Sequence, residues 1–541
     1  MTQKHYVTTP IYYVNDRPHI GHVYTTTIAD IIARYRRLCG DDVFFLTGTD
    51  EHAAKVVDSA AERGISTQEW ADKNAGEFEQ TFARLELTND DFIRTSQQRH
   101  KDRVREYVAA LLESGDVYLG DYEGWYDAGQ EEYVPENKAT EYEFKSPFNG
   151  KPLVRKKEKN YFFKLSAYRE PLLTLLEKGE KVDGCSFDVQ PNARKNEIIE
   201  RIRSAEDVPI SRDVAGAGLG DWCITVPGDD AHAIYVWIDA LFNYLTAVDT
   251  PDRRHYWPAD AQLIAKDILW FHAAIWPAML LALRRQPGHE WIDLPGVLYV
   301  HSFWISEGQK MSKTLGNFVD LEKLDHYVET FGLDALRWFL GTQGPLGTTD
   351  SDFSEARFIE TYNAELANTI GNCSSRVAKM IGKYFDGVLP PRNDLPDGAV
   401  KDGVDDFIDV DDFVRVARVQ IEELNLGAYG ATVRGFVSEI DGYIERTSPF
   451  KMWKDEDLRP AVANILYNCA EALRVASVLL WPLIPDRSQE MWRRLGCDDY
   501  VAAVAGKGSG SFDEWTTWGL LQPGTSILQG DPLFPRYQVK K

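Results

Sequence analysis

Two histidines, His19 and His22, lie where an apolar, strand-like segment gives way to an amphipathic helix. Residues at i and i+3 project from one side of the first helical turn, where unpaired backbone N–H groups and the helix dipole favour an anion. Gly21 between them lets a flat ring approach the backbone without a Cβ in the way. The two imidazoles can therefore donate hydrogen bonds to phosphate oxygens that gain charge during a reaction. Taken alone, the pattern also fits two structural histidines, and a metal site would need further ligands.

Two lysines offer the complementary charge. Lys310 and Lys313 occur in "SEGQKMSKTLGN", with Gly308 and Gly316 as possible hinges. Two ammonium groups on a mobile loop can close over a polyphosphate, although a solvated surface loop has the same composition. The order of the motifs along the chain is more specific than either motif, because "HIGH" follows the first predicted strand and "KMSKT" comes about 290 residues later.

A strand, a helix and a second strand surround the histidines. The segments 5–14 and 43–50 are β-branched, aromatic and apolar, as buried strands are. Between them apolar residues recur at helical spacing, at Ile28, Ile31, Ile32, Tyr35 and Leu38. A strand, helix, strand unit of this kind predicts the start of a parallel sheet.

Composition then changes along the chain. Segment 115–226 is rich in Gly, Pro, Asn and aromatic residues and predicts an inserted β-rich module. Strand candidates with adjacent helices return in 233–245 and 261–280, and after Phe353 the pattern is almost entirely that of amphipathic helices. An acidic stretch at 394–412 interrupts these helices and is most simply a solvated loop.

Length and charge limit the possible functions. The 541 residues predict two to four domains. The 60 Lys and Arg against 84 Asp and Glu give a net charge of −24, which argues against a basic, sequence-independent nucleic-acid binder. The six cysteines are scattered and indicate a reducing compartment. The N-terminus lacks the apolar run of a signal peptide, and the apolar stretch 268–283 is too short to cross a membrane, so we expect a cytoplasmic protein.

The chain resembles the methionyl-tRNA synthetases, a family of class I aminoacyl-tRNA synthetases. The segments that carry the resemblance, in order, are "TTPIYYVNDRPHIGHVYTT", "FLTGTDEHAAKV", "GDDAHAIYVWIDALFNYL", "AKDILWFHAAIWPAML", "EGQKMSKTLGN" and "NTIGNCSSRVAKMIGKYFDGVLP". The resemblance implies an α/β fold: a Rossmann-like catalytic domain split by a connective insertion and followed by an all-α anticodon-binding bundle. The implied divisions are the catalytic halves at 1–114 and 227–300, the insertion at 115–226, a stem-contact segment at 301–355 and the bundle at 356–541.

The resemblance also implies a reaction. Methionine and ATP, with Mg²⁺, form methionyl adenylate and pyrophosphate, and methionine then passes to the 3′ end of tRNA(Met), initiator and elongator, with release of AMP. His19 and His22 would stabilise the α-phosphate, Gly21 would accommodate adenine, and Lys310 and Lys313 would hold the departing pyrophosphate. Positions matching the family's methionine site are Ile11, Tyr13, Asp50, Trp237, Ala240, Tyr244, Ile268, His272 and Trp276. Taken on their own, Trp237 and Trp276 fit core packing and Asp50 fits a helix cap.

Anticodon recognition is implied for Asn372, Arg376 and Phe450. Asn372 and Arg376 share one helix face at i and i+4. Phe450 stands where the family usually has Trp, and it offers a smaller stacking surface. Trp453, one turn further, either compensates or belongs to the core.

The chain departs from many relatives in its insertion, where it lacks the cysteine pairs that hold zinc. We therefore expect no structural zinc, and, because no tail matches the domain that makes some relatives dimeric, a monomer. Three rivals remain at this stage. They are a class I synthetase for another amino acid, a small-molecule nucleotidyltransferase with a "HIGH"-like turn, and a synthetase-like RNA-binding protein that lost catalysis.

Overall fold

A six-stranded parallel sheet forms the centre of the computed structural model, which describes residues 3–15, 17–127, 132–134, 136–311, 316–393 and 407–538. Its strand order is β3-β2-β1-β12-β13-β7. The strands are β1 (Lys4–Tyr13), β2 (Asp42–Asp50), β3 (Asp91–Arg94), β7 (Asp188–Gln190), β12 (Ala261–Ala265) and β13 (Val297–His301). The predicted α/β class is confirmed.

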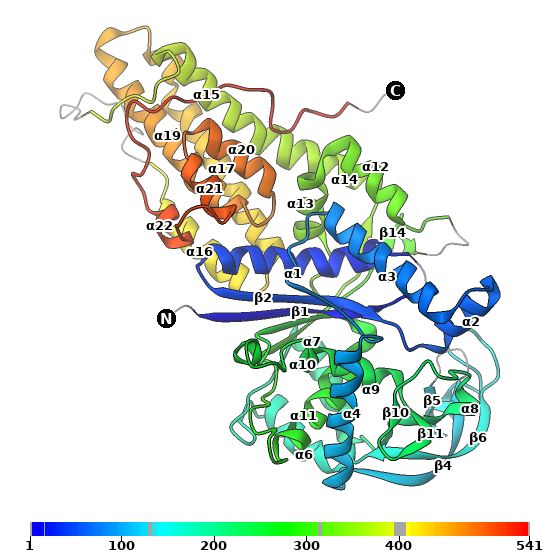
Figure 1. Cartoon of the computed structure of the whole chain (residues 1–541). Coiled ribbons are helices and arrows are strands. Elements are labelled where there is room, and N and C mark those ends of the chain that lie inside the picture. The colour runs from blue at the N-terminus through cyan, green and yellow to red at the C-terminus, as the bar shows by residue number, and fades with distance from the viewer. Residues whose placement is uncertain are drawn as a thin grey trace.

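Both faces of this sheet are buried, which explains why its strands read as continuous apolar runs. Successive side chains of a strand point to opposite faces. Tyr6 and Phe44 accordingly belong to one hydrophobic core, while Val7 and Phe45 belong to another. Helix α1 (Ile20–Leu38) covers the second face, and α4 (Gln98–Glu113), α9 (Val236–Leu241), α10 (Asn243–Thr246) and α11 (Trp276–Arg284) cover the first (Figure 1).

Two elements differ from the sequence prediction. The strand expected at the start of 233–245 belongs to an antiparallel strand, β11 (Asp229–Ile234), and the apolar run continues as α9. A short apolar run fits a buried helix as well as a buried strand, so its periodicity did not distinguish them. The other difference is β7, which lies in the range assigned to the insertion but pairs with β13 in the central sheet. Three residues are too few to show a strand pattern.

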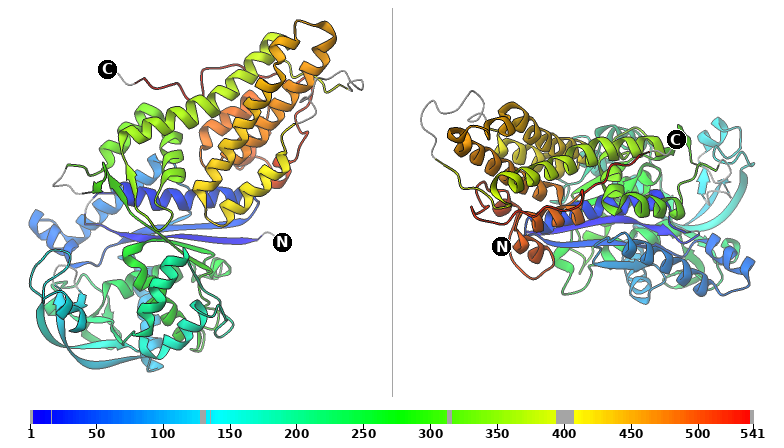
Figure 2. Two further views of the ribbon diagram at one scale, coloured as in Figure 1. Left: turned by 180° about the vertical axis from the view of Figure 1, so that it is seen from behind. Right: turned by 90° about the horizontal axis from the view of Figure 1, so that it is seen from above.

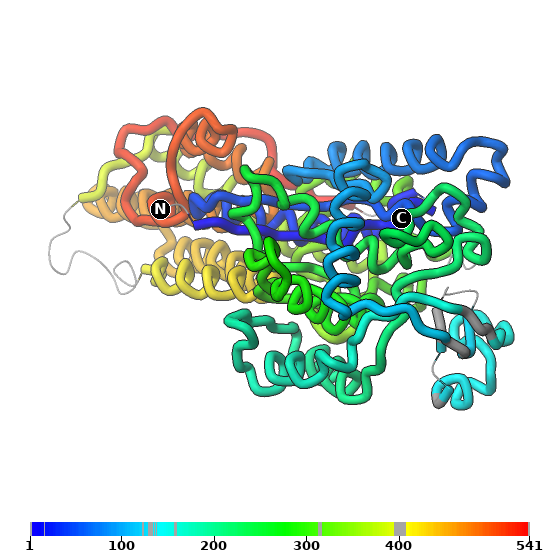
Figure 3. The backbone as a smooth tube through the Cα atoms, turned by 60° about the horizontal axis from the view of Figure 1, so that its bottom comes forward, coloured from blue at the N-terminus to red at the C-terminus, as the bar shows by residue number. Residues whose placement is uncertain are grey.

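Segment 115–226 contributes strands to two antiparallel sheets and also contains several helices. A four-stranded sheet has the order β5-β4-β6-β8, and a three-stranded sheet has the order β10-β11-β9. The bounds are β4 (Val117–Asp127), β5 (Glu132–Val134), β6 (Val154–Phe163), β8 (Val208–Pro209), β9 (Ser211–Asp213) and β10 (Thr225–Val226), with helices α6 (Arg169–Leu176) and α7 (Asn192–Arg203) between them. This module and the far end of the C-terminal helices lie at opposite ends of the molecule (Figure 3).

A small sheet and a long helical region complete the chain. The sheet β15-β14-β16 joins β14 (Trp304–Ser306), β15 (Gln309–Lys310) and β16 (Ser351–Phe353). The helical region rises from the α1 side of the central sheet (Figure 2). Its main helices are α12 (Leu321–Phe331), α13 (Leu333–Gln343), α14 (Glu355–Thr361), η5 (Tyr362–Gly371), α15 (Asn372–Phe385), α16 (Val410–Glu422), α17 (Leu426–Thr447), α18 (Pro449–Met452), α19 (Arg459–Leu480) and α20 (Pro485–Arg494).

A buried charge cluster connects these regions. Asp30 of α1 accepts hydrogen bonds from Arg34 on its own helix and pairs with Arg337 of α13, each at 2.7 Å. The Arg337 side chain is 2% exposed and also donates to the carbonyl of Pro482, just after α19. Burial raises the pKa of Asp30, but Arg337 and Arg34 outweigh burial and lower it to about 2. The ionised carboxylate of Asp30 thus connects α1 to α13 and, through Arg337, to the residues just after α19.

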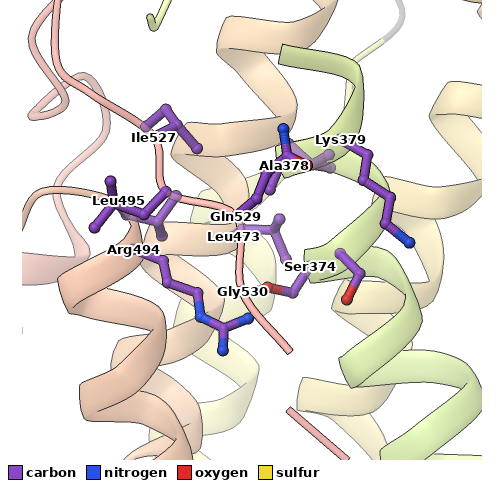
Figure 4. Close-up of a pocket in the computed structure, with 12 residues that line it drawn as sticks. Ser374, Ala378, Lys379, Leu473, Arg494, Leu495, Ile527, Gln529 and Gly530 are labelled. Atoms are coloured by element: carbon purple, nitrogen blue, oxygen red, sulfur yellow. The ribbon is translucent and has the colours of Figure 1, made fainter. Parts of the chain in front are cut away.

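The last residues of the chain hold the helical region together. Leu528 donates its N–H to Arg494 at the end of α20, and Tyr537 donates its N–H to the Asn363 side chain in η5. A cavity of about 20 Å³ remains where this segment crosses α15, α19 and α20 (Figure 4). That volume holds about one water molecule, so the cavity is a packing gap.

Candidate active site

A cavity of about 320 Å³ opens at the carboxyl ends of β1, β12 and β13 and at the N-terminus of α1. In parallel α/β sheets this edge is where ligands bind. A register shift between Thr8 and Ile11 of β1 brings an irregular backbone to the cavity wall, beside Pro10, which has no N–H to donate to a neighbouring strand. The lining includes Pro10, Ile11, Tyr12, Tyr13, His19, Gly21, His22, Thr25, Asp50, Trp237, Ala240, Tyr244, Asp267, Ile268, His272, His301, Ser302, Phe303 and Trp304.

His19 and His22 cap the helix that they begin. Helix α1 starts at Ile20, so His19 is its N-cap and not a residue of the first turn, as the sequence predicted; His22 is its third residue. The N–H of Gly21 donates to Nδ1 of His19 at 3.1 Å, and the N–H of His19 donates to Nδ1 of His22 at 3.2 Å. The two rings stack with centroids 3.8 Å apart. Imidazoles here fill the positions that Ser and Glu fill in an ordinary capping box.

This capping fixes the chemistry of both rings. Because each Nδ1 accepts a backbone N–H, the neutral form of each imidazole carries its proton on Nε2. Burial, and the neighbouring His19, hold the pKa of His22 well below 6.5. Both rings line the cavity, so each can direct its Nε2–H donor into the cavity at a helix N-terminus.

The predicted methionine residues gather on the other side of the same cavity. Eight of the nine line it; Trp276 is fully buried and packs behind Tyr244, with ring centroids 5.8 Å apart. Trp237 stacks on Phe271 at 4.2 Å and 9°, with the ring of Tyr13 edge-on at 5.9 Å. Tyr13 and Trp237 thus form an aromatic wall of the cavity, with Phe271 packed on Trp237. An aromatic surface of this kind suits a thioether.

His272 lies on the same side of the cavity and is hydrogen-bonded through both ring nitrogens. Nδ1–H of His272 donates to the carbonyl of Ile268 at 3.0 Å, so its Nε2 accepts from the hydroxyl of Tyr244 at 2.8 Å. Burial lowers the pKa of His272 to about 4, and the ring is therefore neutral at physiological pH. Asp50, 2% exposed at the end of β2, brings a carboxylate to the same cavity beside Tyr13, its register partner on β1.

His301, at the end of β13, is a lining residue that the sequence analysis missed. Its Nδ1–H donates to the carbonyl of Ser302, and its Nε2 lies 2.8 Å from the hydroxyl of Thr25 on α1. Burial lowers the pKa of His301 to about 4. Its position at the carboxyl end of a buried strand was the available signal, because side chains there face the ligand edge of a parallel sheet.

Residues that follow the lysine motif contact His19 and the start of α1. Phe318 packs edge-on against His19 at 5.3 Å, and the N–H of Ile20 donates to Val319. Lys310 is exposed at the end of β15 and does not line the cavity as described. Lys313 falls at 312–315, outside the described residues. Phe318 and Val319, which follow the lysine motif, thus contact the start of α1, although about 290 residues separate the two motifs in the sequence.

The proposed anticodon residues lie on the helical region. Arg376 of α15 pairs with Asp441 at 2.7 Å and Glu445 at 2.5 Å, both on α17. Phe450 follows α17 and its ring is 38% exposed. Asn372, at the start of α15, is exposed.

Trp453 is half-buried and packs against the hydrophobic core. Its ring centroid lies 4.8 Å from that of Tyr384 and 5.2 Å from that of Phe385, with Arg459 over its face. The core alternative for this tryptophan therefore fits the structure.

The described residues hold no group of three or more His, Cys, Asp or Glu side chains arranged to bind a metal ion. No helix among them is long and apolar enough to span a bilayer.

Comparison with known proteins agrees with this geometry. The family described as "tRNA synthetases class I (M)" matches residues 5–141 and 142–378. The fold and the site thus define a class I tRNA synthetase. Methionine–tRNA ligase of Streptomyces coelicolor is 40% identical over 552 residues, covering 99% of this chain and 97% of the relative. The chain belongs to the methionine–tRNA ligase family.

Other relatives support the same assignment. Methionine–tRNA ligase of Bacillus subtilis is 36% identical and covers 99% of this chain and 78% of its own length. Among solved structures, Mycobacterium tuberculosis methionyl-tRNA synthetase in complex with methionyl-adenylate has a TM-score of 0.85 at 31% identity, covering 99% of this chain and all of that one.

Proposed function

We propose that this chain activates L-methionine with ATP and transfers it to tRNA(Met), initiator and elongator, through the cavity described above. The observation that carries the proposal is the joint placement of two capped, neutral imidazoles and of Asp50 with its aromatic wall around one cavity. The methionine carboxylate attacks the α-phosphorus of ATP and pyrophosphate leaves. Attack by a carboxylate needs no general base, so orientation and charge stabilisation provide the catalysis.

In this reaction the two histidines act as donors. Nε2–H of His19 and of His22 donates to α-phosphate oxygens as they gain charge, and Gly21 leaves room for adenine beside the backbone. Lys310 and Lys313 hold the departing pyrophosphate together with the Mg²⁺ that accompanies ATP. The contact of Phe318 with His19 supports this arrangement, because it anchors the lysine segment beside the phosphate site.

Methionine binds between Asp50 and the aromatic wall. The Asp50 carboxylate pairs with the substrate ammonium. The thioether lies among side chains of Ile11, Tyr13, Trp237, Ala240, Tyr244, Ile268 and His272, and Trp276 supports Tyr244 from behind. Because Tyr244 donates its hydroxyl to His272, neither group presents an unpaired donor to the apolar substrate.

Asn372, Arg376 and Phe450 read the anticodon, which places the anticodon function on the helical region at 356–541. The other divisions keep the roles implied by the resemblance: catalysis at 1–114 and 227–300, a connective insertion at 115–226, and stem contact with the mobile lysines at 301–355. We further propose a monomer that acts in the cytoplasm and needs no structural zinc. An apolar cluster of Val134, Ala139 and Leu153 in the insertion supports the last point.

The test of the function is amino-acid-dependent exchange of labelled pyrophosphate into ATP, followed by charging of tRNA(Met). We expect exchange with methionine and little with leucine, valine or cysteine. Homocysteine should give measurable exchange, because one methyl group is worth only about 1–3 kcal/mol of discrimination. Exchange driven by another amino acid and absent with methionine contradicts the proposal.

Substituting Phe450 by alanine should reduce kcat/KM for tRNA(Met) by about 10- to 100-fold, because stacking on an aromatic side chain contributes about 1–3 kcal/mol per base. Pyrophosphate exchange, which needs no tRNA, should be unchanged. Phe450→Trp should improve charging through its larger surface. Val419→Ala, which trims another exposed apolar side chain of the helical region, is the control. Equal losses in both alanine variants would remove Phe450 from anticodon recognition.

A further inference from the structure

A buried cluster of two histidines and an aspartate lies just outside the cavity. The Asp239 carboxylate is 2.6 Å from Nδ1 of His52 and 2.7 Å from Nε2 of His100. The side chains are 2%, 3% and 0% exposed, respectively. They come from three elements, because His52 follows β2, Asp239 lies in α9 and His100 lies in α4. None of the three lines the cavity.

The carboxylate determines how both rings are protonated. An ionised carboxylate only accepts hydrogen bonds, so His52 donates from Nδ1 and His100 donates from Nε2. Burial by itself raises the pKa of Asp239, but the bonds to His52 and His100 outweigh burial and hold the pKa well below its usual value. A single buried charge thus accepts two hydrogen bonds from different parts of the fold. An uncharged side chain of the same shape cannot accept both in this arrangement.

The turn that carries His52 is held on other sides as well. Glu51 accepts a hydrogen bond from Nε of Arg94 at 2.6 Å, and its carbonyl accepts one from Nε1 of Trp222 at 2.6 Å. Its N–H donates to the hydroxyl of Thr95 at 2.9 Å. The bond from His52 to Asp239 ties this turn to α9.

The position of the cluster in the chain connects it to the substrate. Asp50, two residues before His52, lies at the carboxylate side of the cavity. Trp237 and Ala240, on either side of Asp239 in the chain, lie on its apolar side. The hydrogen bond between His52 and Asp239 therefore connects the turn after Asp50 to helix α9, which carries Trp237 and Ala240. The length of this bond contributes to the distance between Asp50 and those two residues.

We propose that Asp239 is a positioning residue for methionine, which fixes the spacing between Asp50 and the wall formed by Trp237 and Ala240 by accepting hydrogen bonds from His52 and His100. The inference rests on the proposed role of Asp50 in binding the substrate ammonium. It predicts that loss of the hydrogen bonds among Asp239, His52 and His100 weakens the use of methionine and leaves the ATP side of the cavity unchanged, because none of these three residues contacts the phosphate site.

Asp239→Asn should reduce kcat/KM for methionine in pyrophosphate exchange by roughly 100-fold, the scale expected when a reacting group is displaced by about 1 Å. The KM for ATP should stay within about twofold of wild type, and the preference for methionine over homocysteine should fall. Asp249→Asn is the matched control, because Asp249 is 3% exposed and contacts α4 through Tyr107 and Arg103 but does not touch the Asp50 turn. It should leave all three quantities near wild type.

A second pair of variants covers the case in which Asp239→Asn fails to fold. His100→Gln keeps a donor near the place of Nε2 and should retain most of the methionine kcat/KM, whereas His100→Leu loses that donor and should not. Equal effects of His100→Gln and His100→Leu, or equal rises in KM for methionine and ATP, would overturn the proposal. Methionine-dependent exchange by the wild-type protein tests the proposed function separately, since it succeeds or fails whatever the variants do.

Discussion

Replacing His22 with asparagine lowers kcat for methionine-dependent pyrophosphate exchange by about 100- to 1000-fold, the usual effect of removing one donor from a charged transition state. The asparagine oxygen can still accept the N–H of His19, as Nδ1 of His22 does at 3.2 Å, so the helix cap is kept. What disappears is the Nε2–H that we propose donates to the α-phosphate. The KM for methionine should change by no more than about threefold, because the residues proposed to bind methionine lie on the other side of the cavity.

His22→Gln is the informative partner of that variant. Its amide nitrogen reaches about as far as Nε2, so it should recover part of the rate that His22→Asn loses. Because the pKa of His22 lies well below 6.5, the wild-type rate should show no ionisation of this ring as the pH falls through 6.5. Thermal unfolding of each variant checks that the cap survives. A loss of stability that accounts for the loss of activity would reduce His22 to a capping residue.

Asp30→Asn should lower the free energy of unfolding by about 3–5 kcal/mol, the cost of removing one partner from a buried ion pair. The substitution keeps the shape of the side chain but leaves the buried guanidinium of Arg337 without the carboxylate that lies 2.7 Å from it. Chemical denaturation followed by tryptophan fluorescence measures the effect. The same carboxylate makes stability depend on pH, because its pKa is lowered from 3.8 to about 2. Its contribution is complete above pH 3.8 and is lost as the pH falls toward about 2.

Two further variants separate charge from packing. Asp90→Asn removes an aspartate that pairs with Arg37 of α1 at 2.7 Å but is 38% exposed. This substitution should lower the free energy of unfolding by at most about 1 kcal/mol. Arg337→Met combined with Asp30→Asn should recover part of the loss, since the fully buried guanidinium of Arg337 is then no longer left without its carboxylate. A double variant as unstable as the sum of its single variants would mean that the two side chains act independently.

Several features of the fold were predictable from local pattern. The strand, helix, strand start at 4–50 was found because each element is long and its apolar residues follow one clear period. The class and family followed from two motifs whose order is specific, and the helical nature of the chain after Phe353 followed from its 3.6-residue period. Local pattern misassigned two elements: β7 has three residues, too few to show a period, and the apolar run at 233–245 fits a buried helix as well as a buried strand.

The sequence by itself determined which residue types the site contains and which chemistry they support. Only the tertiary structure decided which of those groups meet. It brought Phe318 against His19, moved Trp276 behind Tyr244 and joined His52 to Asp239 and His100. The physical reason is that composition and period report local preference, whereas proton positions, pKa values and contacts depend on burial and on partners distant in the chain.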